Sequence, residues 1–229
     1  MRLFVPVTNA AIVALTVAAV TAEPAQPDPR AVMALDAFLS GRTLARQYAA
    51  TRRLEATGSG QRGWLDVRTR YGADSGFAYD VTSEGGSGLI RGRVLKSLLE
   101  EEKQLIASGT GARVALTRDN YAFTPESLNP DGSVVVTLRP LRKERSLIAG
   151  RLILSADGVL QRVEGQLAKN PSFWVTRVNV VRTYRLINGV LMPVCLETTA
   201  RLRFLGSSSL RMTYSYSEID EQPVDDGSL

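Results

Sequence analysis

The sequence predicts a mainly β (α+β) protein, in which an antiparallel sheet of about ten strands curls into an open half-barrel and two helices cover its concave face. Three observations predict this fold class. Apolar and polar residues alternate along most of the chain after Tyr48, as in strands with one buried face. Short turn sequences separate these runs, which favours antiparallel neighbours. Helical spacing is confined to two segments, and a wide sheet with the usual twist curls.

The first 22 residues are predicted to be a secretory signal peptide. A positively charged start precedes an apolar segment that ends in small residues at Ala22. The competing interpretation is a membrane anchor, but the longest apolar stretch, residues 10–20, is shorter than the ~20 residues that a spanning helix needs. We therefore expect cleavage near Ala22 and a periplasmic mature protein. The expected organisation is a signal peptide at 1–22, a linker at 23–28, one domain at 29–220 and a C-terminal tail at 221–229.

The first helix is predicted over residues 29–40. Asp28 stands at the N-cap position, Pro29 at the first helical position, and Gly41 where a helix would stop.

The second helix is predicted over residues 87–108, where Ile90, Val94 and Leu98 recur at every fourth position. Basic residues lie in its first half and three glutamates, at 100–102, lie towards its end. This order opposes the helix dipole. We therefore expect the helix to be held by its apolar stripe packing on the sheet.

The strands are predicted from alternation of apolar and polar side chains. The first begins at Tyr48 and ends before the turn at 57–60, and further runs cover residues 65–71, 77–82, 134–139, 148–154, 174–185, 200–204 and 209–216. Hairpin signals rich in Gly, Asn, Asp and Ser lie between them, at 57–60, 72–76, 129–132, 157–158, 188–189 and 206–207. We expect one meandering sheet with an Arg-rich wet face and an apolar face that needs a cover.

An apolar cavity is expected where two helices cover this wide face incompletely. Apolar side chains at period two serve equally as core or as a cavity wall, and both interpretations stay open. The residues expected to line a ligand cavity are Ile90, Val94, Leu98, Val136, Leu152, Leu154, Trp174, Val178, Val180, Tyr184, Leu202, Phe204, Met212 and Tyr214.

The composition excludes several kinds of chemistry. The 229 residues include no His and one Cys, which excludes Ser-His-Asp and Cys-His catalysis, His-ligated metal sites and an internal disulfide. The formal net charge is +5, and the cations are spread along the chain, so nucleic acid is not an expected partner. No catalytic residue, metal ligand or cofactor is predicted.

Four local features each have a functional and a structural interpretation. The glutamates at 100–102 fan around a helix and favour a solvated face over a metal site. Cys195 has no His to activate it and favours a packed side chain over a nucleophile. Residues 85–88 favour a strand-to-helix turn over an anion site. The basic residues within 139–145 favour a solvated loop over a contact with anionic headgroups.

Residues 147–218 resemble a group of exported bacterial proteins. The matching segments are Ala149-Gly150-Arg151-Leu152, Val163-Glu164-Gly165, Ala168-Lys169-Asn170-Pro171-Ser172-Phe173-Trp174-Val175, Tyr184 and Leu210-Arg211-Met212-Thr213-Tyr214. They resemble outer-membrane lipoprotein-sorting-like proteins of the LolA/LolB-like superfamily, in an uncharacterised branch. The resemblance implies an open barrel closed by helices, with a hydrophobic cavity for lipid acyl chains and no enzymatic activity or cofactor.

The function expected from these observations is that of an exported, non-enzymatic and monomeric binding protein. Its cavity would hold a lipid acyl chain or the lipid moiety of a lipoprotein, for trafficking in the envelope. The alternative is an envelope sensor or protein-interaction module of the same fold, which docks an envelope membrane protein and carries no lipid. An enzyme is the least favoured class, because the sequence shows no convergent polar cluster.

Overall fold

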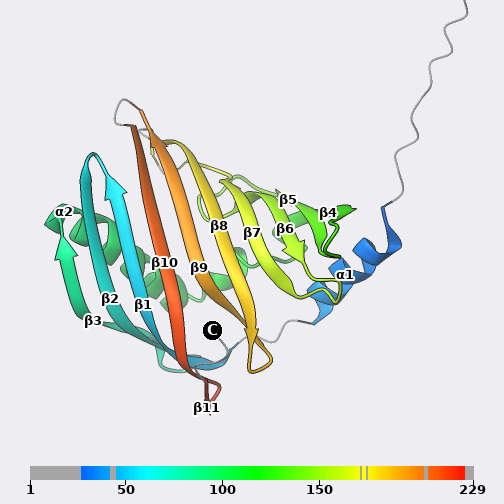
Figure 1. The fold of residues 1–229 in the computed structure, drawn as a ribbon, viewed down its shortest axis with the longest axis horizontal. Helices are drawn as coiled ribbons and strands as arrows, with labels where there is room; N and C mark the ends of the chain where they lie inside the picture. The colour runs from blue at the N-terminus through cyan, green and yellow to red at the C-terminus, as the bar shows by residue number, and fades with distance from the viewer. Residues whose placement is uncertain (1–26, 42–44, 171, 174, 204–205, 225–229) are drawn as a thin grey trace, which may run out of the picture.

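A computed structural model describes residues 27–41, 45–170, 172–173, 175–203 and 206–224. These residues form an antiparallel, unclosed sheet of eleven strands, and helices lie on one side of it (Figure 1). The predicted fold class, a mainly β protein with a curled sheet and a helical cover, is confirmed. The strands are β1 (Gln47–Gly58), β2 (Gln61–Gly72), β3 (Gly76–Gly86), β4 (Tyr121–Leu128), β5 (Val134–Pro140), β6 (Ile148–Leu154), β7 (Leu160–Leu167), β8 (Val175–Ile187), β9 (Val190–Leu202), β10 (Gly206–Ile219) and β11 (Gln222–Pro223).

The strand order corrects the prediction of one continuous meander. The order is β3-β2-β1-β10-β9-β8-β7-β6-β5-β4, with β11 paired to the end of β10. The sheet therefore consists of two meanders joined by the pairing of β1 with β10. After β3, at one edge, the chain crosses the concave face as a helix and enters β4 at the other edge (Figure 1). Hairpin signals specify neighbours within a meander, but not this long-range pairing.

The first helix, α1 (Pro29–Ser40), has the predicted bounds. The Asp28 carboxylate accepts a hydrogen bond from the backbone N–H of Arg30 at 2.8 Å, which caps the first turn. The helix lies against β4, β5 and β6 and buries Ala34, Leu35 and Phe38 there. It therefore covers one end of the concave face only.

The second helical segment differs in detail from the regular helix predicted at 87–108. It comprises α2 (Gly88–Ile90), a π-helical stretch η1 (Arg91–Lys96) and α3 (Ser97–Ala107), and a 3₁₀ turn, η2 (Thr110–Arg113), follows. A π-helical turn holds one more residue than an α-helical turn, so the buried stripe shifts by one position. Ile90, Leu95 and Leu99 are buried, whereas Val94 is 37% exposed. In the described ranges, no helix is long and apolar enough to cross a membrane.

The concave face carries the core in two main clusters. One lies between α1 and strands β4 to β7 and includes Phe38, Val136 and Leu152. The other lies between the second helical segment and strands β1, β2 and β8 to β10, and it includes Leu95 and Val180. The cavity described below lies where the two clusters meet.

The convex face is wet and charged, as the alternation predicts. Its arginines face acidic side chains on neighbouring strands: Arg53 Nη1 lies 2.8 Å from Asp66 Oδ2, and Arg211 Nη1 lies 3.5 Å from Glu197 Oε1. Such exposed pairs contribute only about 0–1 kcal/mol each to stability. Their arrangement nonetheless explains why so many arginines are spread along the sequence.

Candidate ligand cavity

A cavity of about 320 Å³ opens on the concave face. Strands β6 to β9 form one wall, and the end of α3 with the loop that follows it forms the other. Its lining comprises nine aliphatic side chains, two tyrosines, one Ser, one Thr and one Arg. These residues are Leu105, Val114, Leu116, Tyr121, Ser146, Ile148, Val163, Leu167, Val178, Val180, Arg182, Tyr184, Leu196 and Thr198. A mostly apolar lining with few polar groups is typical of small-molecule sites.

The floor of the cavity follows from the alternation along β8. Val178 and Val180 are buried on the concave side, while Arg177 and Asn179 between and beside them are exposed. Register pairing then places Thr198 of β9 beside Val180. Because paired residues share a face of the sheet, neighbouring strands continue the same wall.

A buried ion pair lies next to the cavity, under the second helical segment. Arg52 of β1 has a side chain that is only 1% exposed, and its Nη1 lies 2.6 Å from Oε2 of Glu102 on α3. Its Nη2 also donates to the other Glu102 oxygen at 3.1 Å and to the Tyr48 hydroxyl at 2.7 Å. This bidentate contact joins the helix to the sheet.

Aromatic rings surround the same guanidinium. Arg52 Cζ lies 4.7 Å from the Tyr214 ring centroid and 5.0 Å from that of Phe77. Such cation–π contacts stabilise a desolvated cation. Although burial opposes it, the hydrogen bond and charge of Glu102 raise the pKa of Arg52, so the group remains ionised. Burial raises the pKa of the neighbouring Tyr48 to about 12.

Arg182 is a second cation on the concave side, and it lines the cavity itself. Its register partners are Val163 and Leu196, both buried and apolar. In the described residues Arg182 makes no ion pair, and its polar partner is the hydroxyl of Tyr184. The charge interaction with Tyr184 raises the pKa of Arg182, while burial opposes the shift. The side chain remains exposed, and it lines the cavity.

The structure distributes the residues predicted to line a ligand cavity among several environments. Val178, Val180 and Tyr184 line the cavity described here. Five others are buried within the core clusters: Ile90, Val136, Leu152, Leu154 and Met212. Leu98 and Tyr214 are half-buried against the second cluster, Leu202 is half-buried near the end of β9, and Val94 is exposed. Trp174 and Phe204 lie outside the described residues.

Sequence reasoning missed Arg182 and Arg52, although a signal for both was present. Arg182 follows Val178 and Val180 at the same alternating positions, and Arg52 precedes Leu54 and Ala56 in the same way. Residue type alone places an arginine on the wet face, whereas position in the alternation places these two on the concave face. An arginine at the strand positions that otherwise carry apolar, concave-side residues is the sequence signal that identifies Arg182 and Arg52.

The interpretation of the three glutamates as a solvated helix face is wrong for Glu102, whereas Glu100 and Glu101 are exposed. Glu102 binds Arg52, as described above, and Glu100 accepts a hydrogen bond from the Tyr79 hydroxyl at 2.6 Å. Only Glu101 faces solvent without such a contact among the described residues. The helix is therefore held by polar contacts to the sheet in addition to its apolar stripe.

The remaining local candidates have structural roles. Ser87 caps α2 by accepting from the backbone N–H of Ile90 at 3.5 Å. In the loop after β5, Arg142 donates to Asn120 Oδ1 at 2.8 Å and to Glu144 at 2.7 Å. Burial raises the pKa of the Cys195 thiol, which disfavours the reactive thiolate. In the part of the chain that the structure describes, no group of three or more acidic or Cys residues could hold a metal ion.

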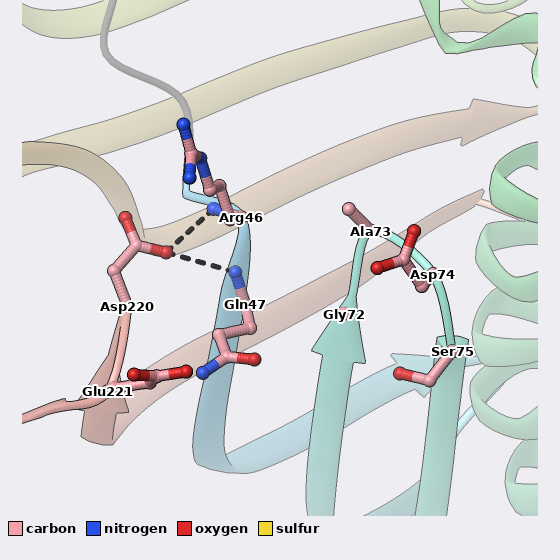
Figure 2. A pocket seen from close by; sticks show the side chains of 8 residues that line it. All are labelled: Arg46, Gln47, Gly72, Ala73, Asp74, Ser75, Asp220 and Glu221. Carbon is pink, nitrogen blue, oxygen red and sulfur yellow. Dashed lines mark hydrogen bonds between the residues drawn. The ribbon is translucent and has the colours of Figure 1, made fainter.

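A second hollow, about 510 Å³ in volume, is an open polar groove at one end of the sheet. Figure 2 shows the turn Gly72–Ser75 on one side and Asp220 and Glu221 on the other. The Asp220 carboxylate accepts from the backbone N–H groups of Arg46 and Gln47, at 2.7 and 3.0 Å. This contact fixes the start of β1 to the turn after β10, so we assign Asp220 a structural role.

Comparisons with known proteins found two similar solved structures. No family model and no curated protein matches the chain. A DUF1329 family protein from Desulfovibrio piger has 8% identity and a TM-score of 0.37, and the alignment covers 81% of this chain and 90% of that one. A LolA superfamily protein from Nitrosomonas europaea has 12% identity and a TM-score of 0.36, and the alignment covers 89% of this chain and 97% of that one. At these scores neither likeness supports an argument about function, and the fold class rests on the strand order.

Proposed function

We propose that this chain is an exported, non-enzymatic binding protein that holds a single hydrophobic chain, such as a lipid acyl chain, in the cavity over β6 to β9. One observation carries the proposal. The helices cover the sheet incompletely and leave a cavity of about 320 Å³, with a mostly aliphatic lining, between two filled core clusters. Well-packed interiors hold few voids larger than a water molecule, so an opening of this size suits a ligand.

The size of the cavity limits the ligand. A methylene group occupies roughly the volume of a water molecule, ~30 Å³, so 320 Å³ accommodates about ten of them. At about 0.8 kcal/mol for each buried methylene, ten contribute ~8 kcal/mol before the cost of ordering the chain. A single chain of medium length fits this space better than the several long chains of a lipoprotein.

The test combines co-purification with a cavity-filling variant. The protein is purified from cells, extracted lipids are identified by mass spectrometry, and uptake of a fluorescent fatty acid is titrated. Val180→Trp fills the cavity, and we expect it to weaken uptake at least tenfold. Val181→Trp on the same strand, beside Glu164 and Glu197 of the convex face, is the matched control and should bind normally.

Folding of both variants is checked by circular dichroism and thermal melting. Leu105→Trp, on the helical wall, replaces Val180→Trp if that variant does not fold. A folded wild-type protein that contains no lipid and takes up no fatty acid would overturn the proposal. That result would favour the sensor or interaction module instead.

A further inference from the structure

Arg182 brings a second positive charge to the cavity. Among the described residues it forms no ion pair, and Glu102 acts on it only through the longer-range charge interaction. Two guanidinium groups and one carboxylate belong to the cavity and the polar cluster next to it: Arg52, Arg182 and Glu102. Both oxygens of Glu102 are engaged by Arg52, at 2.6 and 3.1 Å. The pair is electrically balanced, so Arg182 remains as one surplus positive charge.

Apolar side chains border Arg182, although its own side chain is exposed. Val163 and Leu196 flank it on the neighbouring strands, and Val180 lies on the same face of its own strand. Tyr184 offers Arg182 a hydroxyl as a hydrogen-bond partner and no carboxylate. An exposed cation beside an apolar wall can pair with the acidic head of a ligand whose chain packs against that wall.

We propose that the ligand is an anionic single-chain amphipath, whose acidic head pairs with Arg182 and whose chain lies against the aliphatic wall. This inference rests on the proposed function and defines the ligand class of the same cavity. The guanidinium fork matches a carboxylate or a phosphate, both of which accept two parallel hydrogen bonds from it. Tyr184 beside it supplies a further hydroxyl for a head oxygen. Chain length follows from the volume, and head charge follows from Arg182.

Calorimetric titration of the full chain with four matched probes tests the inference. The probes share a ten-carbon chain and carry different heads: decanoate, decyl phosphate, decanol and decyltrimethylammonium. We expect the better of the two acidic probes to bind at least tenfold more tightly than decanol, and the cationic probe to bind more weakly still. Comparison of decanoate with decyl phosphate identifies which acidic head is preferred.

Two variants assign the preference to Arg182. Arg182→Gln should reduce the advantage of the acidic probes over decanol to less than threefold, while decanol binds as before. Arg177→Gln, an exposed position on the same strand, should retain the wild-type preference. Because head-group preference is measured on the wild type itself, the test does not depend on either variant folding.

The outcomes separate this inference from the proposed function. Equal binding of the acidic probes and decanol, or a preference that survives Arg182→Gln, would overturn the role of Arg182 and leave the binding function standing. Failure of all four probes to bind the folded protein would overturn both.

Discussion

Glu102→Gln tests the buried ion pair that joins the helix to the sheet. Arg52 is 1% exposed and its guanidinium contacts both Glu102 oxygens, so neutralising Glu102 leaves a buried charge without its partner. Breaking a buried pair in this way lowers the free energy of unfolding by about 3–5 kcal/mol. Because the Glu102 side chain is itself 29% exposed, water compensates in part. We therefore expect a loss of about 3 kcal/mol, at the low end of that range.

The reverse substitution should have a smaller effect. Arg52→Met removes the buried charge and fills similar space, and it leaves Glu102 where water reaches it. We expect a loss of ~1 kcal/mol or less, because exchanging a buried ion for an apolar side chain is often neutral. In the double variant, Glu102→Gln should add almost nothing to Arg52→Met, since the partner charge is gone.

Urea unfolding followed by circular dichroism measures these free energies. Glu197→Gln is the control, because both side chains of the Glu197–Arg211 pair are exposed. This substitution should change the free energy of unfolding by less than about 0.5 kcal/mol. The reasoning would be refuted if Glu102→Gln were as stable as wild type. It would also be refuted if Arg52→Met were less stable than Glu102→Gln, because the buried charge would then be stabilising without its partner.

Further predictions concern backbone packing and alkaline pH. In Gly150→Ala the new Cβ would lie 2.0 Å from the backbone oxygen of Glu164, so urea unfolding should show a loss of about 2 kcal/mol; wild-type stability would contradict this close contact. Gly92→Ala meets open space in a helical segment and should raise stability by roughly 0.5–1 kcal/mol. Burial raises the pKa of Tyr48 and Tyr79 to about 12, from an ordinary value of 10.0. The stability that these two protonated phenols contribute to the fold is therefore complete below pH 10 and is lost as the pH rises through 12. In a tyrosinate absorbance titration of the folded protein, part of the absorbance change should appear well above the ordinary pKa of 10.0.

Much of the secondary structure could be predicted because its signals are local. The capping group of Asp28 and the stop at Gly41 correctly bound α1. The dipeptide Asn188-Gly189 forms the β8–β9 turn with positive φ at both residues, 50° and 76°, as its sequence predicts. In each case the residues that decide the conformation lie within a few positions of one another.

The second helix shows where local reasoning stops. A regular helix would bury Ile90, Val94 and Leu98 on one stripe, but the π-helical stretch at 91–96 turns Val94 outwards and buries Leu95. The sequence spacing does not reveal an inserted residue of this kind. It is decided by how the segment packs on β1 to β3.

The sequence predicts an apolar cavity on the concave face, but it identifies only some of the residues that line it. Alternation along β8 identifies Val178 and Val180, but the opposite wall comes from Leu105, Val114 and Leu116, which lie far from β8 in the sequence. Which apolar positions form filled core and which border a space depends on how far the helices reach across the sheet. The sequence pattern of a single strand or helix does not show how far the helices reach across the sheet.

The amino-acid sequence alone predicts the fold class, the two helical segments and the division of the sheet into a charged face and an apolar face. These properties follow from the period of the side chains and from turn chemistry, which act over a few residues. The pairing of β1 with β10, the burial of Arg52 against Glu102 and the place of Arg182 in the cavity lining are visible only in the folded chain. The physical reason is that burial and charge balance are properties of neighbours in space, and these neighbours come from strands and helices that are distant in the chain.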